Sequence, residues 1–225
     1  MPGRIVPLVT DSYYHVFNRG VAKGATFTSD HEYRRAISTL SYYCHLEKPY
    51  SLSRLYRFDP ERQNKILHSI KEGNKLVEVP CFCLMPNHFH LLLRQNVDGG
   101  ISKYLSNFQN SYTRFFNTVH KRDGPLFLSR FKAVEIETEE QLLHVSRYIH
   151  LNPYVGSVVQ SLDNLRGYPW SSLQEYTGGV KNNFVNTDIV QSMFSSKDSY
   201  IKFVFDEAEY RRTLKRSEKL LLDFG

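Results

Sequence analysis

Two histidines, His88 and His90, lie two positions apart in the apolar segment CFCLMPNHFHLLLRQ, in which no acidic or basic side chain other than histidine precedes Arg94. Side chains alternate between the two faces of a β-strand, so both imidazoles are expected on one face while their neighbours point into a core. Two neutral imidazoles about 7 Å apart along a strand can converge on one metal ion. The alternative is a pair of partly buried histidines with ordinary hydrogen-bond partners, because an isolated H-x-H pattern often arises by chance.

A second set of polar residues recurs at four-residue spacing in the segment HVSRYIHLN. Residues four apart share one face of a helix, so His144, Tyr148 and Asn152 are expected in one row, separate from the apolar residues that bury the helix. The amide oxygen of Asn152 is a suitable ligand for Mg²⁺ or Mn²⁺, and Tyr148 places a hydroxyl beside such an ion. The histidine pair and this row together predict a metal site with a tyrosine hydroxyl next to it.

The segments that would position these residues have the spacing of alternating strands and helices. Ser29, with Glu32 three residues later, is typical of a helix start, and Thr138 followed by two glutamates marks another helix, which Pro153 is expected to end. The expected strands are 12–20, 75–86, 88–95 and 130–137, and the expected helices are 29–47, 60–72, 101–120 and 138–152. This order of elements predicts an α+β sandwich with a mostly antiparallel sheet.

The composition favours an anionic partner. Lys and Arg number 29 against 23 Asp and Glu, a formal charge of +6, and the 15 Tyr and 15 Phe suit single-stranded nucleic acid, although such rings can equally fill a core. The sequence has three cysteines, Cys44, Cys81 and Cys83, which is an odd number, and a C-x-C pair alone is a poor zinc site. We therefore expect these cysteines to be small core residues in a reducing cytoplasm. The first residues lack the apolar core of a secretory signal, and no run approaches the roughly 20 apolar residues of a membrane span.

Three segments, MPNHFHLLL, GPLFLSRFK and SRYIHLNP, resemble in their order and spacing the single-tyrosine transposases of the His-hydrophobic-His endonuclease superfamily. The branch that the chain most resembles is that of the REP-associated tyrosine transposases, which YYHVFNRG and YPWSS also match. The resemblance covers about residues 10–178 and implies a ferredoxin-like antiparallel sheet with packed helices. We therefore expect a catalytic domain over 1–159 and a C-terminal helical appendage over 160–225.

The resemblance also implies roles for the site residues. His88 and His90 become ligands of a divalent metal, Mg²⁺ or Mn²⁺, and Tyr148 becomes the nucleophile that attacks DNA and forms a 5′-phosphotyrosine. Members from insertion sequences usually carry a glutamine four residues after the tyrosine as third ligand; this chain has the shorter Asn152, so a water can complete the shell. His144, one turn before Tyr148, is either an acceptor for the phenol proton or a plain structural residue.

Single-stranded or hairpin DNA is the partner that the resemblance implies, since the family binds hairpins of palindromic repeats, and a cytoplasmic, nucleoid-associated protein is expected. In some relatives the tyrosine helix serves the histidines of a second copy and in others the site is built within one chain, so a homodimer is left open. The candidate phosphate contacts, each of which can also be an ordinary surface charge, are Arg19, Arg114, Lys121, Arg122, Arg130 and Lys132.

Other readings of the same residues stay open. Tyr112 is expected to fill a core or to stack on bases, and Tyr104 is a second candidate nucleophile. The main alternative function is a non-catalytic nucleic-acid-binding protein that retains the fold. A third is a nuclease that acts through metal-bound water and leaves no protein–DNA adduct.

Overall fold

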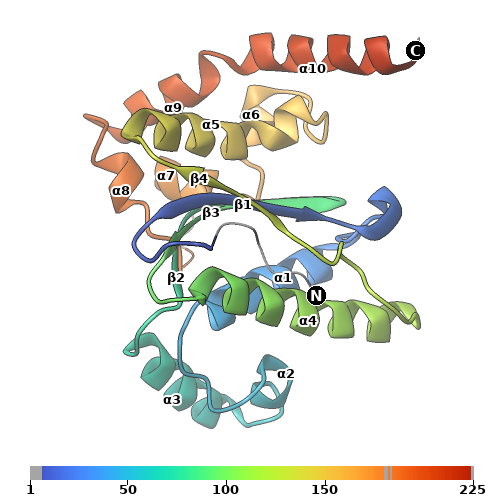
Figure 1. Ribbon diagram of the computed structural model, residues 1–225, viewed down its shortest axis with the longest axis vertical. Helices are drawn as coiled ribbons and strands as arrows, with labels where there is room; N and C mark the ends of the chain where they lie inside the picture. The colour runs from blue at the N-terminus through green and yellow to red at the C-terminus, as the bar shows by residue number, and fades with distance from the viewer. Residues whose placement is uncertain (1–6, 180–181, 183, 224–225) are drawn as a thin grey trace.

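The centre of the fold is an antiparallel sheet in the order β2-β3-β1-β4, built from β1 (Tyr13–Arg19), β2 (Val77–Met85), β3 (His88–Gln95) and β4 (Lys132–Ile136). The computed structural model describes residues 7–179, 182 and 184–223, with side chains as far as Lys215. Helices α1 (Asp30–Tyr43) and α4 (Gly100–His120) cover one face of the sheet, and α5 (Glu139–Val155) lies over the other (Figure 1). This is the βαββαβ arrangement of ferredoxin-like folds, so the predicted α+β class is confirmed.

The other helices extend the two outer layers. Beyond α1 lie α2 (Leu52–Leu55) and α3 (Pro60–Lys71), and a 3₁₀ turn, η1 (Val21–Lys23), follows β1 (Figure 1). On the side of α5 lie α6 (Leu162–Arg166), α7 (Leu173–Thr177), α8 (Asp188–Gln191), α9 (Lys197–Phe205) and α10 (Ala208–Asp223). Within the described ranges, no helix combines the length and the apolar character that crossing a bilayer requires.

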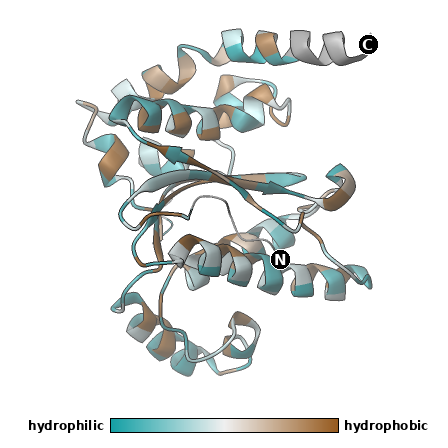
Figure 2. Cartoon of the chain, viewed as in Figure 1, coloured by the Kyte–Doolittle hydropathy of each residue, from teal (hydrophilic) through white to brown (hydrophobic). Residues whose placement is uncertain are grey.

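The sheet separates two hydrophobic cores because neighbouring side chains of a strand point to opposite faces. Tyr14, Val16 and Phe89 pack with α1 and α4, whereas Cys81 and Leu92 pack with α5 and the helices after it. The strands carry brown, hydrophobic segments between helices that alternate brown and teal (Figure 2). The second core takes side chains from α6 to α10, so the segment predicted as an appendage packs directly on the sheet layer.

The local signals at the start of α1 act partly as predicted. The Ser29 side chain accepts a hydrogen bond from the Glu32 backbone N–H, which caps the helix. The reciprocal half of the capping box is replaced, because the Glu32 carboxylate accepts hydrogen bonds from Thr28 and lies 2.7 Å from His120 of α4. The buried Glu32 therefore links the beginning of α1 to the end of α4.

Pro153 does not end α5, contrary to the expectation from the sequence. The helix continues through Pro153 to Val155 and ends at Gly156, whose N–H bonds to the Asn152 carbonyl at 2.7 Å. A proline inside a helix removes one hydrogen bond and costs about 3 kcal/mol. Pro153 and Tyr154 are buried, so packing against the second core offsets that cost.

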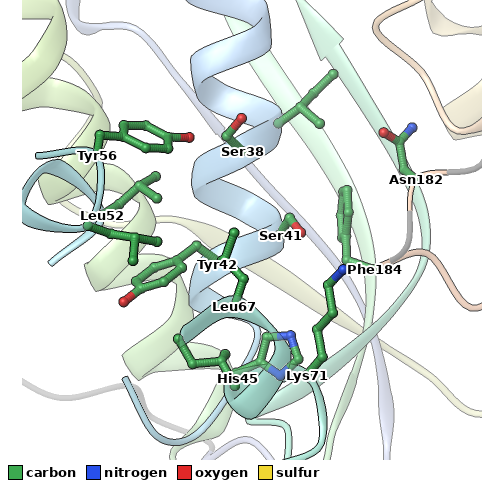
Figure 3. A pocket seen from close by; sticks show the side chains of 13 residues that line it. Ser38, Ser41, Tyr42, His45, Leu52, Tyr56, Leu67, Lys71, Asn182 and Phe184 are labelled. Carbon is green, nitrogen blue, oxygen red and sulfur yellow. The ribbon is translucent and has the colours of Figure 1, made fainter. Parts of the chain in front are cut away.

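A cavity of about 330 Å³ lies between α1 and α3, on the sheet face opposite to Tyr148, and is lined by His45, Lys71 and Phe184 among others (Figure 3). His45 is 6% exposed, and its Nδ1 has no hydrogen-bond partner among the residues that the structure describes. Burial, and then the charges of Lys75, Lys48 and Lys71, lower the pKa of His45 to about 4. The imidazole is therefore neutral in the folded protein at pH 7.

This histidine predicts a pH-dependent stability. An unfolded chain protonates His45 near pH 6.5, whereas the folded chain does so only near pH 4, so acid favours unfolding between these values. We expect the free energy of unfolding to fall from pH 6.5 to 4 by up to about 1.4 kcal/mol per pH unit from this residue. Urea denaturation of the wild type and of His45→Gln across this range measures it. Parallel profiles of the two proteins would contradict the assignment.

Candidate active site

His88 and His90 lie on β3 with both rings on the face that α5 covers, as strand alternation predicts. The centroids of the two rings are 5.0 Å apart and the rings are nearly perpendicular. His90 is buried, with 6% of its surface exposed, and His88 is half-buried. Strand β1 lies beside them in antiparallel register, with Phe17 opposite His90, and it brings a third imidazole, that of His15, to the same face.

Hydrogen bonds orient both rings through their Nδ1 atoms. Nδ1 of His88 lies 2.6 Å from Oδ1 of Asn87, and since an amide oxygen only accepts, Nδ1 carries the proton and Nε2 keeps a lone pair. Nδ1 of His90 lies 3.0 Å from Nε2 of His15. When Nδ1 of His90 is the donor of that bond, its Nε2 is an acceptor as well. The two Nε2 atoms are then both available to a ligand.

The three imidazoles are neutral at pH 7. Burial lowers the pKa of His15 to about 4, and burial together with the charges of Lys215 and Arg19 lowers that of His88 to about 4. The pKa of His90 is also lowered well below its ordinary value, by burial and then by its histidine neighbours and Lys215. Neutral imidazole is the form that binds metal ions, so the histidines of the site are in the protonation state that metal binding requires.

Tyr148 of α5 lies directly over this group within the same chain. The centroid of its ring is 5.4 Å from that of His90 and 5.6 Å from that of His15, both in edge-to-face geometry, and 39% of the residue is exposed. Burial raises the pKa of the Tyr148 phenol, while a hydrogen bond from Asn152 and the charge of Arg211 oppose that rise. The phenol is therefore protonated at pH 7 and stays in contact with solvent.

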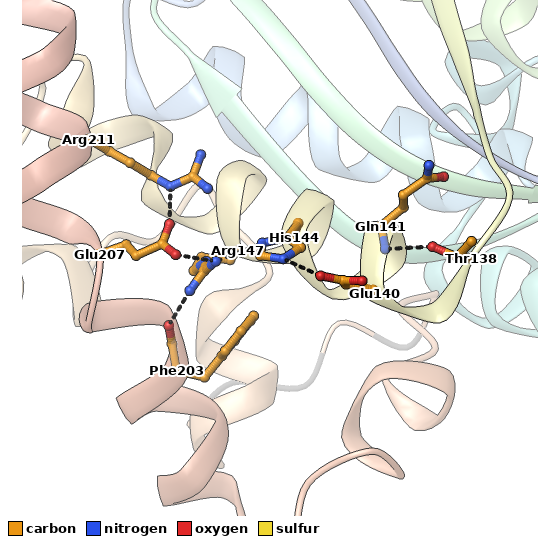
Figure 4. A network of polar contacts seen from close by, with 8 residues as sticks. All are labelled: Thr138, Glu140, Gln141, His144, Arg147, Phe203, Glu207 and Arg211. Atoms are coloured by element: carbon orange, nitrogen blue, oxygen red, sulfur yellow. Dashed lines mark hydrogen bonds and ion pairs between the residues drawn. The ribbon is translucent and has the colours of Figure 1, made fainter.

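The other two members of the predicted polar row lie differently. Asn152 is 4% exposed and its Nδ2 donates to the Tyr148 carbonyl at 2.8 Å, so it stays beside the tyrosine. The His144 ring instead bonds to Arg147 at 2.7 Å, lies 3.6 Å from Glu140, and has no hydrogen bond to the Tyr148 hydroxyl. The structure thus brings Asn152, but not His144, to Tyr148 (Figure 4 shows the surroundings of His144).

The donors present suit a divalent metal that keeps waters or substrate oxygens in its shell. Among the residues that the structure describes, no cluster of three or more His, Cys, Asp or Glu side chains is arranged to hold a metal. His88 and His90 supply two oriented imidazole nitrogens, and Asn152 is a candidate amide oxygen. Mn²⁺ and Mg²⁺ accept such mixed shells, so these residues fit the predicted ion.

Three of the predicted DNA contacts gather beside His88. Arg19, Arg130 and Lys132 line a cavity of about 360 Å³ together with His88 and Lys23. The Phe17 ring, with the Lys132 ammonium 5.9 Å from its centroid, also borders this cavity. The arrangement places positive charge and an aromatic ring next to the histidine pair. Proteins that bind single-stranded nucleic acid use the same combination.

The other predicted DNA contacts lie away from that cavity. Arg114 is exposed on α4, on the opposite side of the sheet, and Lys121 and Arg122 follow the end of α4. The Arg122 guanidinium donates to the Pro125 carbonyl at 3.0 Å and lies over the Phe116 ring. These three residues belong to α4 or follow it, on the face of the sheet opposite to the α5 helix of Tyr148.

Tyr104 and Tyr112, the other tyrosines considered from the sequence, are both fully buried in the first core. The Tyr112 hydroxyl donates to the Thr26 carbonyl at 2.8 Å, which explains its burial. Neither hydroxyl is exposed to a substrate, so Tyr148 is the accessible phenol beside the histidine pair.

Sequence reasoning missed His15, Lys23 and Lys215 as members of this site. His15 lies in the expected strand 12–20, but the neighbouring strand that makes His90 its partner is far away in sequence. For Lys215 only the basic character of the last helix was a signal, because its approach to the site depends on how α10 packs on α5.

Comparison with known proteins identifies the family of this chain. Residues 36–152 match the family of IS200-like transposases, a range that contains His88, His90, Tyr148 and Asn152. A solved structure of a REP-associated tyrosine transposase bound to a REP hairpin aligns with a TM-score of 0.50 at 14% identity, covering 87% of this chain and 96% of the other; the likeness is one of fold. No curated protein sequence matches the chain. Since the family match spans more than half of the sequence, this chain belongs to the IS200-like transposase family.

Proposed function

We propose that the protein is a metal-dependent transposase that nicks and rejoins single-stranded DNA near hairpins through a 5′-phosphotyrosine on Tyr148. The observation that carries the proposal is the meeting, within one chain, of an accessible phenol with two oriented neutral imidazoles. Membership of a transposase family supports a reaction on DNA.

The proposed reaction exchanges one phosphate ester for another. The Tyr148 oxygen bonds to phosphorus as the P–O3′ bond breaks, the phenol gives up its proton, and the departing oxygen takes a proton to become a 3′-hydroxyl. Because the bond energy is kept in the phosphotyrosine, a later 3′-hydroxyl can reverse the step without ATP. Rejoining then regenerates the free phenol.

The phenol proton needs an acceptor. At an ordinary pKa of ~10 a tyrosine is about one part in a thousand phenolate at pH 7, and burial raises the pKa of Tyr148 further. His144 stays our candidate acceptor, and to act it would have to turn from Arg147 towards the phenol on the same row of α5.

His88 and His90 would hold the divalent ion through their Nε2 atoms, with Asn152 as candidate third ligand. When bound, Mg²⁺ or Mn²⁺ would reduce the charge on a non-bridging oxygen of the attacked phosphate. His15 would keep His90 oriented by accepting its Nδ1–H, in the manner of the outer residues that fix metal-binding histidines.

DNA is the substrate that the basic surroundings support. Arg19, Lys23, Arg130 and Lys132 line the cavity beside His88 and suit the phosphates of a strand that crosses the site. The solved structure with this fold carries a REP hairpin, and we propose a hairpin with a single-stranded extension as the ligand of this chain.

Incubation of the purified protein with end-labelled hairpin DNA and Mn²⁺ or Mg²⁺, resolved on a denaturing gel, tests the function. We expect a labelled protein–DNA adduct and a shortened DNA strand. Binding without cleavage would instead identify a non-catalytic DNA-binding protein, and cleavage without an adduct would identify a nuclease that uses water.

Replacing His15 is expected to weaken metal binding although His15 is not itself a ligand. Loss of its hydrogen bond in His15→Ala frees the His90 ring, and outer-shell losses of this kind typically reduce metal affinity about 10–100-fold. Titration calorimetry with Mn²⁺ on the protein without DNA measures the affinity. His15→Gln keeps an acceptor and should bind more tightly than His15→Ala; equal affinities of all three proteins would refute the role.

A further inference from the structure

A second cavity adjoins Tyr148 and shares no lining residue with the basic cavity of His88. It measures about 240 Å³ and lies between α5 and α10. Its polar lining consists of Tyr148 and Asn152 from α5 and of Arg211 and Lys215 from α10, and no carboxylate of a residue with a described side chain lines it. Two cations next to an exposed phenol are a feature that suits an anionic ligand, although Arg211 also pairs with Glu207 outside the cavity lining.

The position of these two cations is fixed by contacts that hold α10 on α5. The buried Arg147 forms an ion pair of 2.7 Å with Glu207, and Glu207 also accepts from Arg211 Nε at 2.8 Å (Figure 4). The next residue, Arg212, donates to Gln160 at 3.1 and 3.0 Å, and its guanidinium lies 4.2 Å from the centroid of the Tyr154 ring. Helix α10 is therefore attached to the tyrosine helix by buried and charged contacts.

The same contacts leave positive charge directed to the cavity. Arg211 and Lys215 are four residues apart and share one face of α10. Glu207 is paired with both Arg147 and Arg211, so one negative charge meets two positive ones. Among the residues that the structure describes, the terminal nitrogens of Arg211 and the Lys215 ammonium have no hydrogen-bond partner.

These cations also act on the candidate catalytic groups. The charge of Lys215 contributes to the lowered pKa values of His88 and His90, and the charge of Arg211 lowers the pKa of the Tyr148 phenol against the effect of burial. Lys215 and Arg211 thus lie within electrostatic reach of the groups that would surround the attacked phosphate.

We propose that Arg211 and Lys215 of the last helix form a phosphate-binding site that holds the phosphodiester next to the one attacked by Tyr148. The ligand class is a single strand of DNA, and the inference rests on the proposed function. The strand would pass from the basic cavity of His88, over Tyr148, to this site. Helix α10 lies outside residues 36–152, so the site is an addition to the segment that matches the family.

The test compares Arg211→Gln/Lys215→Gln with a matched control, Lys197→Gln/Lys202→Gln, which removes two exposed charges from α9. Affinity for a fluorescent hairpin with a single-stranded extension is measured by anisotropy at several salt concentrations without metal. Loss of two phosphate contacts should weaken binding about tenfold or more at 0.1 M salt and flatten the salt slope by roughly 1.4. The control should keep the slope of the wild type.

Lys215→Gln alone separates a direct contact from a loosened helix, because Lys215 has no ion pair with a described residue whereas Arg211 binds Glu207. This variant should show about half of the change in salt slope that is expected for the double variant, and it should keep the melting temperature of the wild type. If wild-type protein forms the covalent adduct but both variants match the α9 control in affinity and slope, the phosphate site is refuted while the proposed function stands. Absence of the adduct from wild-type protein would refute the proposed function instead.

Discussion

Tyr148→Phe is expected to abolish the covalent protein–DNA adduct and to reduce cleavage by at least about 10³-fold, because the variant lacks the oxygen that bonds to phosphorus. The ring stays against His90 and His15, so folding and DNA affinity should remain close to those of the wild type. The adduct is measured by a denaturing gel with DNA labelled at the 3′ end, the side that would remain on the protein.

The matched control for this substitution is Tyr56→Phe, which removes the hydroxyl of a similarly exposed tyrosine on the opposite side of the sheet. Tyr56 is 46% exposed, against 39% for Tyr148, and it lines the cavity of His45. Full activity is expected for this control. An adduct of undiminished yield with Tyr148→Phe would show that another side chain is the nucleophile, and peptide mapping of that adduct would identify it.

Removal of the histidine pair is expected to have the second largest effect. In His88→Ala/His90→Ala the two oriented nitrogens are lost, and we expect Mn²⁺ binding to disappear from calorimetric titrations and cleavage to fall by at least about 10²-fold. Affinity for hairpin DNA in the presence of a chelator should change little, since the Arg and Lys side chains of the basic cavity are kept. A chelator added to wild-type protein should reproduce the loss of cleavage.

His68→Ala is the control for the histidine pair, because His68 is exposed on α3, remote from α5. It should bind metal and cleave as the wild type does. Cleavage that persists in the double variant, or in the presence of a chelator, would show that the imidazoles do not act through a metal. Loss of DNA binding in the same variant would instead place His88 and His90 among the DNA contacts.

The sequence predicted this site to the extent that local periodicity defines it. A period of two placed His88 and His90 on one strand face, and a period close to four placed Tyr148 and Asn152 on one helix face; the structure has both arrangements. The same period put His144 in the row, yet its ring bonds to Arg147, which is held by Glu207, the residue before α10. The direction of the His144 side chain thus depends on Glu207, about 60 residues away, and the local spacing of residues carries no information about such a partner.

Strand faces, helix starts and the class of the fold therefore follow from the amino-acid sequence alone, since they depend on residues a few positions apart. The tertiary structure decided which elements are neighbours. The pairing of β1 with β3 gives His90 its partner His15, 75 positions earlier, and the packing of α10 on α5 brings Arg211 and Lys215 to Tyr148. Such contacts form because two hydrophobic faces must bury each other, and that requirement selects partners by shape and area across the whole chain rather than by local order.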